Sequence, residues 1–163
     1  MSPLLRQGHR VPYATLAELW IDEVRPVTTD ALFSTRHTLV IGVPGAFTPT
    51  CSEKHLPDFI QMADSLKRSG FHDIIVISPS DPFAVAAWAT QVDPDGKLRF
   101  VSDGNLEFTR KAGLTSHEDR FFLGERSKRY LMIVRNAIVD RLSVEDSVLN
   151  VSCSRAQSLE LDF

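Results

Sequence analysis

Apolar and polar positions follow two different periods along the middle of the chain, and these periods predict strands and helices in turn. Residues 38–43 and 71–77 are short apolar runs rich in β-branched side chains, which is typical of strands buried on both faces. Between them, apolar residues recur at helical spacing and predict one buried helix face: Leu56, Phe59, Ile60, Ala63 and Leu66. Thr50 and Glu53 have the spacing of a capping box for this helix, and Gly70 predicts its end.

The same alternation continues toward the C-terminus. Asp81 followed by Pro82 has the order of an N-cap and a first helical residue, so we expect a helix that continues to about Gln91. A third strand is predicted at residues 97–101 and a short helix at residues 105–112.

The last part of the chain has the pattern of a hairpin. Residues 129–135 and 138–144 predict two antiparallel strands, and Asn136 and Ala137 predict the turn between them. A last short helix is expected at residues 154–161. The complete order predicts an α/β protein whose mixed sheet has helices on both faces.

Composition narrows the class of protein. A chain of 163 residues with 43% hydrophobic and 24% charged residues is typical of one globular domain, here residues 1–163. The net charge of −3 provides no basic surface for nucleic acid. The longest apolar run, residues 39–47, is interrupted by glycine and proline and is shorter than the ~20 residues of a membrane helix. The N-terminus has no pattern of a targeting segment. We therefore expect a cytoplasmic protein without a membrane partner, in which thiols stay reduced unless they do redox chemistry.

The chain has two cysteines, Cys51 and Cys153, too few and too far apart for a disulfide-rich scaffold or a four-cysteine metal site. Cys51 lies at the predicted start of the helix that follows the first buried strand. The unpaired N–H groups of a first helical turn and the helix dipole stabilise a thiolate. We therefore expect the pKa of Cys51 to lie below the ~8.5 of a free thiol. By position alone, an inert buried cysteine is the more common case.

The residues around Cys51 carry more information than its position. The segment reads Pro44-Gly-Ala-Phe-Thr48-Pro-Thr-Cys51-Ser and resembles the active-site motif of the peroxiredoxins, in particular their type II or type 5 (atypical two-cysteine) branch. The resemblance extends from about Val40 to the end of the chain, whereas residues 1–37 match only loosely. Several later segments resemble the same family: residues 78–83, 87–89, 103–110 and 126–130.

The resemblance implies a thioredoxin-like fold and a thiol-dependent peroxidase that uses no metal or other cofactor but requires an external thiol reductant. Cys51 matches the cysteine that attacks a hydroperoxide and becomes a sulfenic acid. Thr48 matches the threonine that orients the peroxide, and Pro44 matches the proline that limits solvent access. Arg129 matches the arginine that stabilises the thiolate and the departing oxygen, with Arg126 as the competing position.

Members of the family differ in where they place the second cysteine, and Cys153 matches one of these positions. Many members of this branch carry a second cysteine at a position that corresponds here to Val76. Animal-type members place it near the C-terminus instead, and residues 143–154 resemble that segment. Cys153 is therefore expected to attack the Cys51 sulfenic acid and form an intramolecular disulfide that thioredoxin reduces. One alternative is an inert Cys153, with the Cys51 sulfenic acid recycled by glutathione and glutaredoxin. The other is a redox sensor without catalytic turnover.

The resemblance also implies a homodimer that packs near the active-site loops, and we expect a face carrying Phe83 and Trp88 at this contact. His55 lies on the same helix face as Cys51 and is predicted to be a polar neighbour of the active site rather than a metal ligand. The sequence contains no Cys-x-x-Cys motif and no Gly-rich phosphate loop. These absences argue against a thioredoxin-type oxidoreductase and against nucleotide binding.

Overall fold

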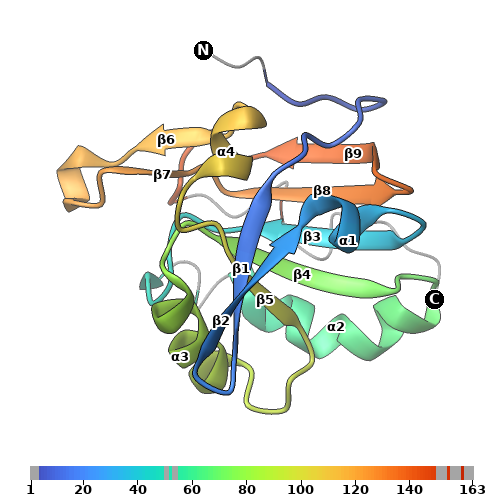
Figure 1. Ribbon diagram of the computed structural model, residues 1–163, viewed down its shortest axis with the longest axis horizontal. Helices are drawn as coiled ribbons and strands as arrows, with labels where there is room; N and C mark the ends of the chain where they lie inside the picture. Colours follow the sequence, from blue (N-terminus) through green and yellow to red (C-terminus); the bar gives the residue numbers. More distant parts are fainter. Residues whose placement is uncertain (1–3, 50–51, 53–54, 150–153, 155–158, 160–163) are drawn as a thin grey trace.

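The structure is a computed structural model that describes residues 4–49, 52, 55–149, 154 and 159. Seven strands form one mixed sheet through its centre (Figure 1). In chain order they are β1 (Thr15–Trp20), β2 (Glu23–Thr28), β3 (His37–Gly42), β4 (Asp73–Ser78), β5 (Arg99–Ser102), β8 (Tyr130–Arg135) and β9 (Ile138–Val144). Side by side, their order is β2-β1-β5-β4-β3-β8-β9. The central strands β3, β4 and β5 are parallel, and the outer strands join the sheet through antiparallel pairs.

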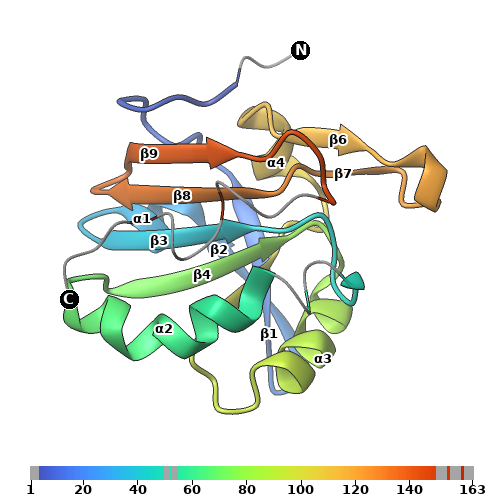
Figure 2. The same cartoon turned by 180° about the vertical axis from the view of Figure 1, so that it is seen from behind.

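Helices cover both faces of this sheet (Figures 1 and 2). They are α1 (Thr29–Phe33), α2 (Leu56–Arg68), α3 (Pro82–Val92) and α4 (Glu107–Lys111). Alternate residues of β3 show the two sides. Val40 packs in the apolar cluster that includes α1 and α4, whereas Leu39 and Ile41 pack in the cluster that includes α2 and α3. The central strands are almost entirely apolar because both of their faces are covered. The predicted α/β class, with a mixed sheet and helices on both faces, is confirmed.

A separate antiparallel hairpin extends from one end of the molecule (Figure 1). Its strands are β6 (Thr115–His117) and β7 (Glu125–Ser127), and a short 3₁₀ helix, Asp119–Phe121, lies between them. None of the described helices is long and apolar enough to cross a bilayer.

The helix and turn signals of the sequence agree with the structure at two places. The Asp81 side chain accepts the N–H of Ala84 at 2.9 Å, and Pro82 opens α3 as predicted. Asn136 and Ala137 form the turn between β8 and β9 with φ values of 52° and 66°. Such left-handed residues are typical of a two-residue hairpin turn.

Three parts of the chain differ from the prediction or lie outside the described residues. The β1–β2 hairpin was missed, because β2 is mostly exposed and its turn at Ile21 and Asp22 contains neither glycine nor asparagine. The predicted cap at Thr50 and Glu53 lies outside the described residues, and α2 begins at Leu56. Most of the helix predicted at residues 154–161 also lies outside them.

Trp88 corrects the expected dimer face. Its side chain is fully buried in the apolar cluster beside α2, so it cannot form part of an exposed contact surface. Phe83, on the same helix, is 59% exposed. The indole ring instead packs edge-on against Phe100, and its N–H donates to the hydroxyl of Ser52 at 2.9 Å.

Gly42 ends β3 opposite Tyr130, its cross-strand partner on β8. The Tyr130 ring is fully buried and lies directly over the glycine. A Cβ atom at position 42 would lie 1.9 Å from Cε1 of Tyr130, a distance that no van der Waals contact allows. The lack of a side chain at position 42 therefore allows the Tyr130 ring to pack over the end of β3 on one face of the sheet.

Candidate active site

The loop that leaves β3 is held in place by hydrogen bonds within the loop and by one that it donates to Ser80 of the next loop. The Ala46 N–H donates to the Ser80 hydroxyl at 3.0 Å, and the Thr48 hydroxyl donates to the Gly45 carbonyl at 3.2 Å. The Ser52 N–H donates to the Thr48 carbonyl at 3.1 Å, which is the spacing of a helical turn. Cys51 lies between Thr48 and Ser52 in the sequence but outside the described residues.

Arg129 precedes β8 and is almost completely buried, with 1% of its surface exposed. Its Nε donates to the Val148 carbonyl at 3.1 Å, and its Nη1 lies 2.9 Å from Nδ1 of His55. A guanidinium has donors and no acceptor, so His55 Nδ1 accepts this hydrogen bond and carries no proton. The proton of the neutral imidazole is then on Nε2, which donates to the Ser154 carbonyl at 3.0 Å.

The same contacts explain the electrostatics of His55. Burial and then the Arg129 charge lower its pKa from 6.5 to about 3, although the Ser154 hydrogen bond and the Glu145 charge act in the opposite direction. The imidazole is therefore neutral over the whole physiological pH range. A neutral ring can accept from Arg129 on one edge and donate to Ser154 on the other.

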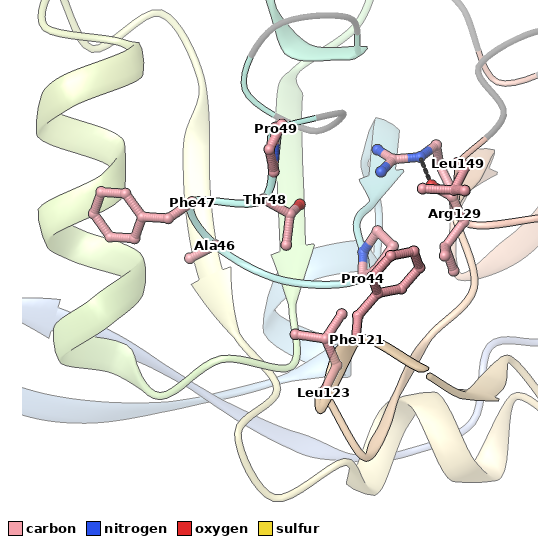
Figure 3. Close-up of a pocket in the computed structure, with 10 residues that line it drawn as sticks. Pro44, Ala46, Phe47, Thr48, Pro49, Phe121, Leu123, Arg129 and Leu149 are labelled. Carbon is pink, nitrogen blue, oxygen red and sulfur yellow. Dashed lines mark hydrogen bonds between the residues drawn. The ribbon is translucent and has the colours of Figure 1, made fainter. Parts of the chain in front are cut away.

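A pocket of about 470 Å³ opens between the β3 loop, the β6–β7 hairpin and the segment after β9 (Figure 3). Its lining residues are Pro44, Ala46, Phe47, Thr48, Pro49, Phe121, Leu123, Arg129, Val148 and Leu149. Most of these side chains are apolar. In Figure 3 the Thr48 hydroxyl and the Arg129 guanidinium point toward the same part of the pocket. The pocket can therefore hold a small molecule that has an apolar part and one polar end that accepts hydrogen bonds.

The structure brings three of the predicted site residues together. Pro44, Thr48 and Arg129 line the same pocket, although Arg129 is far from the other two in the sequence. Arg126, the competing arginine, does not line it. Its Nε donates to the Leu123 carbonyl at 2.8 Å, and its Nη1 lies 3.5 Å from the Ser80 hydroxyl.

The other predicted features have different outcomes. Cys153, like Cys51, lies outside the described residues. Val76, which occupies the alternative second-cysteine position, is buried in β4. Among the described residues, no group of three or more His, Cys, Asp or Glu side chains could hold a metal ion.

Comparison with known proteins identifies the family. The Redoxin family model matches residues 6–157. The reduced form of Prx3 from Vibrio vulnificus, solved in complex with hydrogen peroxide, is 35% identical, with 96% of this chain and 97% of that chain aligned and a TM-score of 0.89. The chain belongs to the peroxiredoxins. Its sheet and helices are those of the thioredoxin-like fold that the sequence resemblance implied.

Two curated relatives place this peroxiredoxin in the type 2/5 group. The hybrid peroxiredoxin hyPrx5 of Haemophilus influenzae and the chloroplastic peroxiredoxin-2E of Arabidopsis thaliana are each 37% identical to it over 85% of this chain. The chain spans 57% of the first and 61% of the second.

Sequence reasoning missed several parts of the pocket in this peroxiredoxin. Phe121 and Leu123 come from the β6–β7 hairpin, and Val148 and Leu149 from the segment after β9. These residues carry no local motif, because apolar side chains that line a pocket have the same pattern as apolar side chains in loops. His55 was expected near the active site, but its hydrogen bond to Arg129 could not be read from the sequence.

Proposed function

We propose that this chain is a thiol peroxidase that reduces hydrogen peroxide and organic hydroperoxides at Cys51. One observation carries the proposal: Pro44, Thr48 and Arg129 line one pocket, and the loop that supplies two of them leads directly to Cys51 in the sequence. The predominantly apolar lining supports organic hydroperoxides as substrates in addition to hydrogen peroxide.

In the proposed reaction, the Cys51 thiolate attacks the terminal oxygen of the peroxide. A sulfur–oxygen bond forms and the oxygen–oxygen bond breaks, so the sulfur is oxidised to a sulfenic acid while the peroxide is reduced. The departing oxygen leaves with the bonding electron pair and takes up a proton, giving water or an alcohol. External thiols then return Cys51 to the reduced state.

Each pocket residue has a distinct role in this proposal. The Arg129 guanidinium stays charged at every working pH, favours the thiolate and stabilises the negative charge that grows on the departing oxygen. The Thr48 hydroxyl both donates and accepts hydrogen bonds, so it can orient the peroxide relative to the sulfur. The Pro44 ring restricts the access of water to the reacting atoms. Burial strengthens these interactions, because the attraction between charges increases when water is excluded.

The test is the rate at which reduced protein consumes hydrogen peroxide and cumene hydroperoxide, followed in single-turnover and in turnover experiments. Cys51→Ser should abolish rapid consumption. Arg129→Lys should lower the second-order rate constant by about 10²-fold, the effect of losing one oriented donor at a developing charge. The matched control, Arg126→Lys, should leave the rate within a factor of about two, because Arg126 lies outside the pocket. Rapid consumption by Cys51→Ser, or equal effects of the two arginine substitutions, would overturn the proposal.

We further propose that Cys153 resolves the sulfenic acid. Its thiolate would attack the Cys51 sulfur, form a disulfide within one chain and release water, and thioredoxin would reduce the disulfide. The alternative is a one-cysteine cycle that uses glutathione and glutaredoxin. Mass spectrometry of the peroxide-treated protein separates the two routes. A peptide pair linked through Cys51 and Cys153 supports the proposal, whereas a glutathione adduct on Cys51 with free Cys153 contradicts it.

A homodimer and a cytoplasmic location complete the proposed function. The dimer prediction is tested by the molar mass of the reduced protein in solution, measured by light scattering. The location is tested by fractionation of the source cells, because one of the similar relatives is named chloroplastic.

Continued turnover with excess peroxide and reductant distinguishes the enzyme from a redox sensor, which would stop after one equivalent of peroxide.

A further inference from the structure

Four buried polar residues form a closed chain of hydrogen bonds beside the pocket. Arg129 donates to His55, and His55 donates to the Ser154 carbonyl. The backbone N–H and the hydroxyl of Ser154 both donate to Oε1 of Glu145, at 2.9 and 2.8 Å. The Glu145 N–H in turn donates to the Arg129 carbonyl at 2.9 Å.

The four residues of this hydrogen-bond network come from separate parts of the fold. His55 directly precedes α2, Arg129 directly precedes β8, Glu145 follows β9, and Ser154 comes nine residues after Glu145. His55 and Ser154 are fully buried, and Arg129 and Glu145 are 1% and 6% exposed. A polar network that is satisfied and removed from water holds its members firmly, because a partner lost there leaves a buried group unpaired.

We propose that His55 is a positioning residue, which holds the Arg129 guanidinium at the pocket through Nδ1 and holds the Ser154 backbone through Nε2. The proposal rests on the role proposed above for Arg129. It goes further, because it assigns two separate contacts to one imidazole, one that orients Arg129 and one that holds Ser154. Cys153 directly precedes Ser154 in the sequence. The rate of reaction with peroxide then reports the contact of His55 with Arg129, and hydrogen exchange at Ser154 reports its contact with Ser154.

The chemistry of the imidazole explains why this position takes histidine. The ring must offer an acceptor to a cation on one edge and a donor to a carbonyl on the other. An amide side chain can reproduce each half separately. The Oδ1 atom of asparagine reaches the place of Nδ1, and the amide nitrogen of glutamine reaches the place of Nε2. His55→Asn therefore keeps the acceptor for Arg129, and His55→Gln keeps the donor for Ser154.

The experiment measures two quantities in both variants. The first is the second-order rate constant of the pre-reduced protein with hydrogen peroxide, and the second is amide hydrogen exchange of the peptide that contains Ser154. His55→Gln should lower the rate constant about tenfold, equivalent to about 1.4 kcal/mol, with exchange close to that of the wild type. His55→Asn should have a second-order rate constant within about threefold of the wild-type value. Its Ser154 peptide should exchange about tenfold faster than in the wild type. The matched control His9→Gln changes an exposed histidine and should alter neither quantity.

A role in packing alone would give a different result, because both variants would then change both quantities in parallel. That result would overturn the proposal, as would an unchanged rate in His55→Gln when Arg129→Lys is slow. A normal rate in Arg129→Lys would instead overturn the role proposed for Arg129, while exchange at Ser154 would still report on the second function of His55.

A measurement on the wild-type protein keeps the proposal testable if a variant fails to fold. Nitrogen-15 spectra of the histidine side chains report which ring nitrogen carries the proton. The proposal requires His55 to be protonated on Nε2 alone, with Nδ1 an acceptor, at pH values where free histidine is already cationic. A proton on Nδ1 would contradict the hydrogen bond from Arg129, because two donors would then face each other.

Discussion

Acidification from about pH 7.5 to about pH 5.5 should destabilise the protein, and His55 supplies a definite part of the loss. Its pKa is about 3 in the fold, mainly because it is buried and next because it faces Arg129, and 6.5 is its ordinary value. The folded state therefore binds no proton at His55 across this interval, whereas the unfolded chain binds one as the pH falls through 6.5. Stability rises with pH wherever the unfolded state holds more protons, so the contribution is complete above pH 6.5 and is lost as the pH falls toward 3.

The size of the effect follows from the same two values. At pH 5.5 the unfolded histidine is one unit below its pKa, so the loss relative to pH 7.5 is about 1.4 kcal/mol. A typical domain has a free energy of unfolding of about 5–15 kcal/mol, so this loss is well within reach of a denaturation experiment. The window also lies above the ordinary pKa values of Asp and Glu, which keeps most carboxylates out of the comparison.

The assay is urea unfolding followed by tryptophan fluorescence at the two pH values. Because His55→Asn has no titrating ring at position 55, its pH-dependent loss should be smaller than that of the wild type by about 1.4 kcal/mol. Ile74→Val, a buried substitution on β4, serves as the matched control and should lower stability by about 1 kcal/mol at both pH values. His37, whose pKa burial also lowers, is present in all three proteins and cancels. An equal pH-dependent loss in His55→Asn and wild type would refute the reasoning.

Three further predictions concern stability, measured by thermal or urea unfolding. Gly42→Ala should destabilise the protein by about 1–3 kcal/mol, because the new methyl group forces the Tyr130 ring to move; an unchanged midpoint would contradict the close contact. Trp88→Phe should lower stability by about 1 kcal/mol or more through loss of the hydrogen bond to Ser52, and equal stability would show that this bond contributes nothing. Asp81→Ala should lower stability by about 1 kcal/mol, whereas Asp81→Asn retains an N-cap acceptor and should restore most of it.

Local signals were sufficient for the centre of the fold. The apolar runs around β3 and β4 predict strands because both faces of each strand are covered, so nearly every position is apolar. The Asp81 cap is readable because it depends only on residues within one turn of helix. The N-terminal hairpin is different. Its edge strand β2 buries little, so no apolar pattern marks it.

Burial on a uniformly apolar helix could not be predicted from periodicity. Nearly every residue of α3 is apolar or small, so the sequence does not show which face meets the sheet. The sequence therefore predicts an exposed Trp88, whereas the structure buries Trp88 completely and exposes Phe83 on the same helix.

The candidate site divides in the same way between local motifs and distant contacts. Pro44 and Thr48 belong to one motif, and the resemblance to a family links Arg129 to them across about half of the chain. The choice of Arg129 over Arg126 agrees with the pocket lining. The contact between Arg129 and His55 depends on how the starts of α2 and β8 lie relative to each other in the fold. No spacing in the sequence encodes the distance between these two side chains.

The pairing of Gly42 with Tyr130 also restricts how this sequence can change during evolution. Any side chain at position 42 collides with the ring, so a substitution there costs less stability once residue 130 has become smaller. The reverse order is open, because a smaller residue at 130 leaves the glycine undisturbed. Among descendants of this sequence, a substitution at position 130 should therefore precede one at position 42 more often than it follows it. Tyr130, which directly follows Arg129 in the sequence, therefore restricts the residues that position 42 at the end of β3 can accept.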